Sequence, residues 1–109
     1  MDYHRRPAPI GVAYYAPERM TSGTWNVLLI AVHPAHEGSG CGTALMRHVE
    51  ADLAAHGARV VLVETSGLPE FERTRAFYRG IGYHQEARIR DFYDAGEDKI
   101  VFSKALPAA

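Results

Sequence analysis

The feature that most limits the possible folds of this chain is a short glycine-rich segment, Gly38 to Gly42 (GSGCG). Six consecutive apolar residues, Val27 to Val32, precede it. Leu45, Val49 and Leu53 follow it at intervals of four, the spacing of one face of a helix. Glycines before a helix permit a tight turn, and the unpaired N–H groups at a helix N-terminus attract anions. The sequence therefore predicts a strand, a phosphate-binding turn and a helix in succession.

The other elements alternate along the chain. Apolar patterns predict strands at 10–15, 25–32, 60–65, 83–91 and 99–105, one helix that ends near residue 57 and another at 69–82. This order, β-β-α-β-α-β-β, indicates an α/β (α+β) domain with a mixed, mostly antiparallel sheet and a central parallel pair of strands joined by the first helix. The run at 25–32 predicts a strand buried on both faces, and 92–98 predicts a loop too long for a tight hairpin.

Size and composition restrict the class of protein. The 109 residues suffice for a single domain, 1–109, in which we expect 1–8 to be a flexible lead-in. Twelve basic and thirteen acidic residues give a net charge of −1, which argues against nucleic-acid or membrane binding as the main task. One cysteine, Cys41, excludes an internal disulfide and fits a reducing compartment. We expect a cytoplasmic protein, since no stretch of the sequence approaches the roughly 20 apolar residues of a membrane span. We also expect no metal site.

A second segment, Arg75 to Tyr83 (RAFYRGIGY), carries Phe77 and Tyr78 at the end of the second predicted helix. Together with the apolar strand, the Val-x-Pro step and the three alternating glycines, it resembles the two signature segments of the GNAT superfamily of N-acetyltransferases. The resemblance extends over about residues 10 to 106, with the same order of elements.

The resemblance implies that the central parallel strands splay apart around coenzyme A, with acetyl-CoA as co-substrate. Backbone groups near the end of the second strand would pair with the pantetheine arm, and amides of the glycine turn would hold the pyrophosphate. Tyr78 would hydrogen-bond the thiol sulfur and protonate the thiolate, for which a phenol is a suitable donor; a plain core aromatic is the alternative. The implied cofactor-binding residues are Leu29, Ile30, Ala31, Val32, Glu37, Gly38, Ser39, Gly40, Cys41, Gly42, Thr43, Phe77 and Tyr78.

Three features depart from the family pattern. Glu37 stands where the family usually has Gln or Arg, so we expect weakened cofactor binding, and Phe71 replaces an Asn that often contacts the cofactor arm. The family also has a strand, two helices and a further strand before the element that begins here at Ile10. Without that layer a sheet edge and a helix-docking face are open, and we expect a homodimer in which a second copy covers them.

The residues that act on the acceptor are predicted from their positions on strands and loops. Transfer to an amine needs a base, and Glu64 on the third strand is the leading candidate, directly or through water. Alternatively, the Glu64 carboxylate faces solvent or an arginine and has no catalytic role. His33 and His36 are further titratable groups near the turn.

The stretch from Arg88 to Asp98 sits where family members often contact their substrate. Its acidic residues suit a cationic acceptor and its two arginines a carboxylate, and a solvated loop is the third possibility. We expect substrate contacts from Asp91, Phe92 and Tyr93.

These observations predict an acetyl-CoA-dependent N-acetyltransferase that moves an acetyl group directly to a primary amine of a small molecule or peptide. The alternative is a non-catalytic acyl-CoA-binding module, or a subunit that needs a partner chain.

Overall fold

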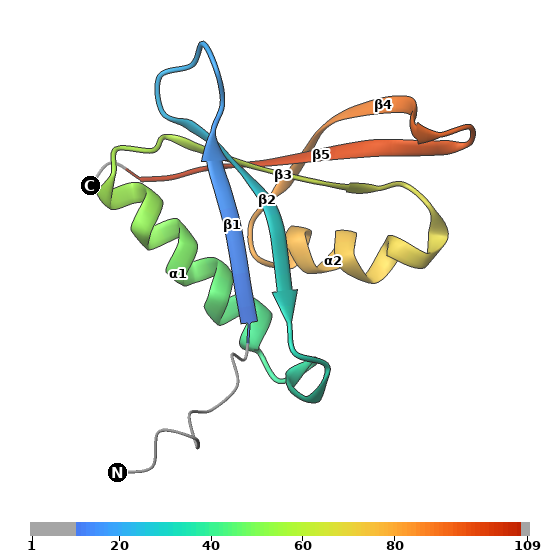
Figure 1. Cartoon of the computed structure of the whole chain (residues 1–109), viewed down its shortest axis with the longest axis horizontal. Coiled ribbons are helices and arrows are strands. Elements are labelled where there is room, and N and C mark those ends of the chain that lie inside the picture. Colours follow the sequence, from blue (N-terminus) through green and yellow to red (C-terminus); the bar gives the residue numbers. More distant parts are fainter. Residues whose placement is uncertain (1–10, 108–109) are drawn as a thin grey trace.

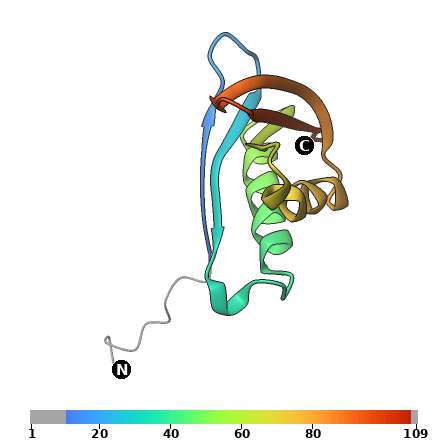
Figure 2. The same ribbon diagram turned by 90° about the vertical axis from the view of Figure 1, so that its right-hand side faces the viewer.

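A five-stranded sheet carries two helices on one of its faces (Figures 1 and 2). The computed structural model describes residues 11–107. The expected lead-in at 1–8 lies outside this range. The elements, in chain order, are β1 (Gly11–Pro17), β2 (Thr24–Val32), the 3-10 turn η2 (Pro34–His36), α1 (Cys41–Ala55), β3 (Val60–Ser66), η3 (Pro69–Phe71), α2 (Glu72–Gly80), β4 (His84–Asp94) and β5 (Glu97–Ala105).

The predicted order of strands and helices and the mixed sheet are confirmed. In space the strands run β1-β2-β3-β5-β4, so the last strand of the chain lies between β3 and β4. β2 and β3 are parallel neighbours joined through α1, and the other neighbouring strands are antiparallel. The sheet is therefore mostly antiparallel with one parallel pair at its centre.

The parallel pair separates part of the way along. Residues 24–27 of β2 pair with residues 60–63 of β3, and no pairing between these strands continues beyond Val27 and Val63. At this point β2 contains an extra residue, Leu28, because Tyr15 of β1 pairs with Val27 whereas Tyr14 pairs with Leu29. A bulge of this kind bends a strand and increases its twist. The second half of β2 thus keeps β1 as a neighbour and turns away from β3.

The core lies between the sheet and the helices. Met46, Val49 and Leu53 of α1 meet alternate residues of the central strands. Two of the three predicted stripe residues are thus buried, whereas Leu45 is half-buried and Met46 takes its place in the core. Burying each such side chain contributes about 1.5–3 kcal/mol of transfer free energy. The buried apolar residues are Val27, Met46, Val49, Leu53, Ala58, Val61, Val63, Tyr78, Tyr83, Ile100 and Phe102.

The prediction that the second strand is buried on both faces is wrong. Leu28 and Leu29 are 55% and 51% exposed. Tyr14, which pairs with Leu29 and therefore shares its face, is 61% exposed. The reason is that both helices cover the same side of the sheet (Figure 2). We call the opposite side, which carries Tyr14, Leu29 and Glu64, the open face.

The predicted loop at 92–98 is also wrong, because β4 and β5 continue through it into a tight hairpin. Only Ala95 and Gly96 separate the strands, and Gly96 has a φ of 81°. Asp91, with a φ of 56°, accepts a hydrogen bond from the Gly96 N–H (2.8 Å) and donates its own N–H to Asp98 Oδ1 (3.0 Å). An aspartate side chain that satisfies backbone N–H groups lets the strands bulge and still turn sharply. Phe92 and Tyr93 are consequently strand residues.

Truncating a core side chain tests this one-sided packing. Leu53 is 1% exposed, so Leu53→Ala should lower the free energy of unfolding by about 2–5 kcal/mol in urea denaturation. Ile89→Ala removes a side chain of equal volume that is 46% exposed and should cost less than about 1 kcal/mol. Equal losses in the two variants would contradict the packing described.

Candidate active site

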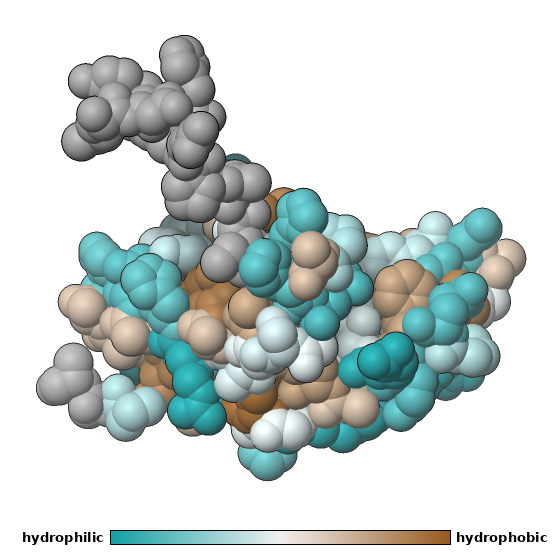
Figure 3. All heavy atoms as spheres, turned by 90° about the horizontal axis from the view of Figure 1, so that it is seen from below, coloured by the Kyte–Doolittle hydropathy of each residue, from teal (hydrophilic) through white to brown (hydrophobic). Residues whose placement is uncertain are grey.

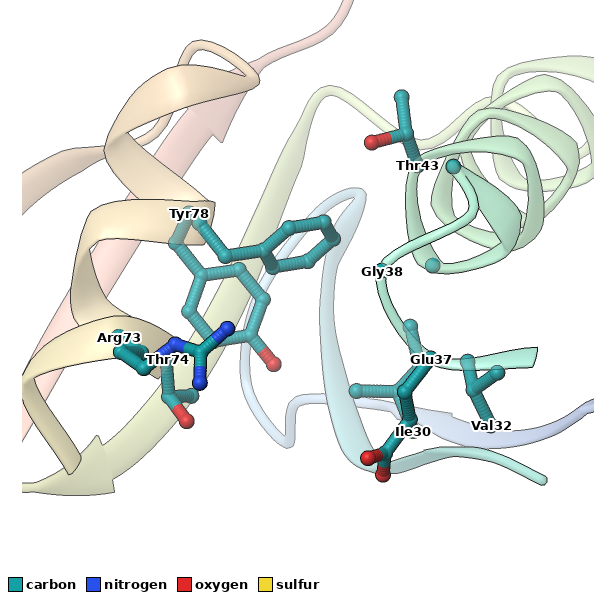
Figure 4. Close-up of a pocket in the computed structure, with 11 residues that line it drawn as sticks. Ile30, Val32, Glu37, Gly38, Thr43, Arg73, Thr74 and Tyr78 are labelled. Carbon is teal, nitrogen blue, oxygen red and sulfur yellow. The ribbon is translucent and has the colours of Figure 1, made fainter. Parts of the chain in front are cut away.

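A cleft of about 530 Å³ opens between the end of β2, the turn and first residues of α1, and α2 (Figure 4). Figure 3 views the molecule from the side on which the β2–α1 turn lies, and apolar side chains there appear at several places among polar ones. The residues that line the cleft are Ile30, Val32, Glu37, Gly38, Gly40, Gly42, Thr43, Arg73, Thr74, Phe77 and Tyr78.

The glycine turn forms one wall of this cleft. Gly38 and Gly40 have φ values of 76° and 84°, which residues with a Cβ rarely adopt. Gly40 directly precedes α1, and the first helical hydrogen bond runs from the Ala44 N–H to the Gly40 oxygen (3.0 Å). The N–H groups of residues 41–43 therefore have no partner within the helix, and no side chain of the N-cap residue competes for them. This wall offers backbone donors at the positive end of a helix.

Gly42 brings this turn against the opposite wall. A Cβ at residue 42 would lie 3.3 Å from Cζ of Phe77, closer than ordinary contact. A side chain at residue 42 would press on the Phe77 ring, so glycine lets the first turn of α1 lie this close to α2. As a result, the backbone donors of α1 and the aromatic residues of α2 face the same cleft.

Tyr78 points its hydroxyl group into the cleft from α2 (Figure 4). The side chain is 5% exposed, and its ring packs against Phe77, Tyr83 and Phe102 at centroid distances of 5.3, 5.8 and 6.0 Å. Burial raises the pKa of the Tyr78 phenol, because the phenolate would lose its hydration. Tyr78 is thus both a core residue and a protonated hydroxyl donor in the cleft. The two interpretations of this tyrosine are compatible.

Arg75 holds the end of β3 against α2. Its side chain is buried, and Nη1 donates to the backbone oxygens of Ser66 (2.6 Å) and Leu68 (2.9 Å). Nη2 donates to Glu72 Oε2 at 2.8 Å. These bonds occupy the carbonyl group of the last residue of β3, Ser66, and that of Leu68 just beyond it. They fix the end of β3 to α2. This attachment lies across the strand opening from β2.

Glu64 lies on the open face, just beyond the last β2–β3 pair. Its Oε1 is 3.1 Å from Lys99 Nζ, and its Oε2 accepts a hydrogen bond from Asn26 Nδ2 at 3.1 Å. The cleft itself is on the helix side. Glu64 and Tyr78 therefore flank the place where the two strands separate, one from each side of the sheet.

The structure brings together most of the predicted cofactor residues. Nine of the thirteen line the cleft, and two residues that the sequence analysis missed, Arg73 and Thr74, line it as well. Those outside its lining are Leu29, Ala31, Ser39 and Cys41. Leu29 and Ala31 alternate with Ile30 and Val32, so their side chains point to the open face. The Ser39 and Cys41 side chains contact each other instead (3.1 Å).

Arg73 and Glu37 place opposite charges on opposite walls (Figure 4). Arg73 comes from the first turn of α2 and Glu37 from the β2–α1 turn. The sequence signal for Arg73 and Thr74 is their helical spacing of four from Phe77 and Tyr78, respectively, which puts each pair of side chains on neighbouring parts of the helix surface.

The residues predicted to contact the acceptor differ in their surroundings. Phe92 and Tyr93 are 50% and 45% exposed, and their rings pack edge to face at 5.0 Å. Asp91, in contrast, is engaged by the hairpin backbone as described above. His33 Nδ1 accepts the Ala35 N–H (3.1 Å) at the start of η2, an exposed cap away from the strand opening.

Two kinds of site do not occur in the part of the chain that the structure describes. Within 11–107, no three His, Cys, Asp or Glu residues are grouped so that they could hold a metal ion. Over the same range, neither helix combines the length and apolarity of a membrane-spanning segment.

Comparison with known proteins identifies the family. Residues 4–85 match the family model described as acetyltransferase (GNAT) domain. The chain belongs to this family. No curated protein matches its sequence.

Solved structures support the same assignment. A GNAT-family protein from Desulfovibrio desulfuricans is 39% identical, with a TM-score of 0.87 over 90% of this chain and 62% of that one. The ribosomal-protein-S18-alanine N-acetyltransferase from Escherichia coli is 22% identical, with a TM-score of 0.76 over 92% and 63%. An aminoglycoside 6'-N-acetyltransferase complexed with coenzyme A is 15% identical, with a TM-score of 0.71 over 93% and 76%. The last two show a shared fold, and the chain spans less than two thirds of the first two proteins.

Proposed function

We propose that this GNAT domain transfers an acetyl group from acetyl-CoA to a primary amine. One observation carries the proposal: a single cleft connects unpaired helix N–H groups at its glycine turn with the hydroxyl group of Tyr78. Anion donors at one position and a proton donor at another are what a thioester with a diphosphate at its far end requires. An acetyltransferase is the activity that uses both.

The residues of the cleft fit coenzyme A. The amides of residues 41–43, together with the turn at Gly38 and Gly40, suit the pyrophosphate. Among residues 11–107, the backbone of β2 beyond Val27 has no strand partner on its β3 side, so its N–H and C=O groups are available to the amides of the pantetheine arm. When bound, acetyl-CoA supplies the thioester: the amine nitrogen forms a bond to the acetyl carbon, the carbon–sulfur bond breaks, the amine loses a proton and the sulfur gains one.

Tyr78 supplies the proton to the sulfur in this proposal. Because burial raises its pKa, the hydroxyl group stays protonated through the neutral range and is present as a hydrogen-bond donor to the departing thiolate. Its ring is held by three other aromatic rings, which limits the directions in which the hydroxyl can point.

Glu64 takes the proton from the amine, directly or through water. It stands on the open face at the strand opening, so an acceptor that approaches from this face meets Glu64 before it reaches the thioester. Phe92 and Tyr93 provide a wall for the same acceptor, with Asp91 shaping the strand that carries them. Acceptor and cofactor thus enter from opposite faces of the sheet.

Replacing Tyr78 separates this enzyme from a non-catalytic acyl-CoA-binding module. Tyr78→Phe should lower kcat by about 10²–10⁴-fold, because a positioned proton donor is lost, while the Kd for coenzyme A changes little. Thiol release in the presence of an amine measures the first quantity and calorimetry the second. Tyr14→Phe, on the open face, is the matched control and should retain its rate. Tight coenzyme A binding without turnover in the unmodified chain would favour the module.

The charge of Glu37 gives a second test. A carboxylate at the cleft repels a diphosphate, so Glu37→Gln should lower the Kd for coenzyme A about two- to fivefold, the effect of roughly 0.5–1 kcal/mol between partly exposed charges. Arg73→Gln should raise the Kd by a similar factor. Calorimetry with Glu86→Gln, outside the cleft, as control checks both. A weaker affinity in Glu37→Gln would show that this carboxylate assists binding.

We also propose that the protein is a cytoplasmic homodimer. The β1–β2 part of the open face exposes Val12, Tyr14, Leu28 and Leu29, and apolar and aromatic residues without charge are typical of the centre of interfaces. Such a neutral surface meets its own copy without repulsion between like charges. Cys41 is a free thiol, which fits a reducing compartment.

A charge on this surface should separate the two copies. Tyr14→Glu places a carboxylate against its own symmetry mate and should convert a dimer to a monomer in sedimentation velocity. Met20→Glu, at a fully exposed position in the β1–β2 turn, should leave the dimer intact. A monomer mass for the unmodified chain at every concentration would contradict the proposal.

A further inference from the structure

Two carboxylates converge on one buried amide at the strand opening. Asn26 is 4% exposed, and its Nδ2 donates both to Glu64 Oε2 (3.1 Å) and to Glu18 Oε1 (3.0 Å). Glu18 follows β1, and its N–H donates to the Thr24 oxygen at 2.9 Å, so the backbone that carries it is fixed. The carboxylates come from different parts of the chain and are neighbours because they share this nitrogen.

This cluster has more acceptors than donors. Lys99 Nζ contacts only Glu64 among the two carboxylates, at 3.1 Å. Within residues 11–107, Oδ1 of Asn26 is buried and has no hydrogen-bond partner. Two carboxylates, an unpaired amide oxygen and a single ammonium group leave a negative surplus. A ligand with further N–H donors and a positive charge would balance it.

The arginines that would favour an anionic acceptor are held elsewhere. Arg88 Nη1 lies 2.5 Å from Asp98 Oδ2, and the pKa of Asp98 is held below its usual value by the Asp91 N–H first, then by Arg88 and least by Arg90. The charge of Arg88 is thereby paired with the hairpin carboxylate. The sequence alone left a cationic and an anionic acceptor equally open, and these contacts favour the cationic one.

Aromatic rings complete the surroundings of the cluster. Lys99 Nζ lies 4.0 Å from the ring centroid of Phe92, so this ring already faces a cation. Partial burial, and after it the charges of Glu64 and Glu97, raise the pKa of the Tyr93 phenol. Carboxylates flanked by aromatic faces are a combination that binds ammonium groups.

We infer that Glu18, Asn26 and Glu64 form an ammonium-binding subsite and that the acceptor carries a second positive charge besides the amine that is acetylated. The inference rests on the proposed acetyl transfer. Glu64 faces the reacting amine and Glu18 holds the other ammonium group. Because both carboxylates touch one amide nitrogen, the two nitrogen atoms of the acceptor are separated by a short chain. The substrate class is a short diamine or a larger molecule with two such amines.

Three acceptors with four carbon atoms each but different charge test the inference. They are 1,4-diaminobutane, butylamine and 4-aminobutyrate, in a thiol-release assay with acetyl-CoA. We expect kcat/KM to be about tenfold higher for the diamine than for butylamine, beyond the factor of two for its two ends, and lowest for 4-aminobutyrate. Glu18→Gln should reduce the diamine to the level of butylamine, whereas Glu86→Gln should not. Equal efficiencies, or a preference for 4-aminobutyrate, would overturn the inference.

A binding measurement separates the subsite from the reaction. Asn26 is the only asparagine in the sequence, so its side-chain amide gives one pair of signals in a ¹⁵N–¹H spectrum, with Gln85 on β4 as an internal reference. Addition of 1,4-diaminobutane should shift the Asn26 pair, and Glu18→Gln should abolish the shift. A shift without acetyl transfer to any amine would support the subsite and refute the proposed function. Transfer to butylamine and diamine alike with no shift would refute the subsite and leave the proposed function intact.

Discussion

The separation of β2 from β3 is the constraint on which the rest of the site depends. Two parallel strands would normally pair along their whole length, because unpaired backbone groups inside a sheet are costly. Here the extra residue Leu28 bends β2 away, and Arg75 occupies carbonyl groups at the end of β3. The opening leaves β2 backbone groups unpaired at the centre of the sheet. A ligand with amide groups of its own can satisfy them, so the fold and the choice of cofactor have the same origin.

Local sequence patterns predicted the parts of the fold that depend on neighbouring residues. The glycine turn, α1 and the position of Tyr78 follow from glycine conformation and helical spacing, and all of them fall where expected. The bulge at Leu28 was not predictable, because an extra residue is defined only against the strand that pairs with it. The exposure of Leu28 and Leu29 was missed for a related reason: an apolar run shows that a face could be buried, not that something covers it.

In the β4–β5 hairpin, polar residues of two strands were predicted to be a loop. Residues 92–98 were predicted to form a loop, but only Ala95 and Gly96 lie between the strands. Asp91 and Asp98 satisfy backbone and arginine partners within the hairpin, so their charges serve the strands first. Composition alone does not distinguish a carboxylate that shapes a turn from one that binds a ligand. The distinction came from its hydrogen bonds.

The two-sided arrangement of this GNAT domain also bears on how it can change. Gly42 against Phe77 joins the cofactor wall to the helix of Tyr78, so alterations there disturb binding and chemistry together. The open face carries its polar and aromatic groups on side chains that do not enter that contact. Substitutions on this face around Glu64 can therefore alter the surface beside the strand opening without touching the cofactor wall. One face of the sheet thus carries the cofactor wall, and the other carries side chains that can vary independently of it.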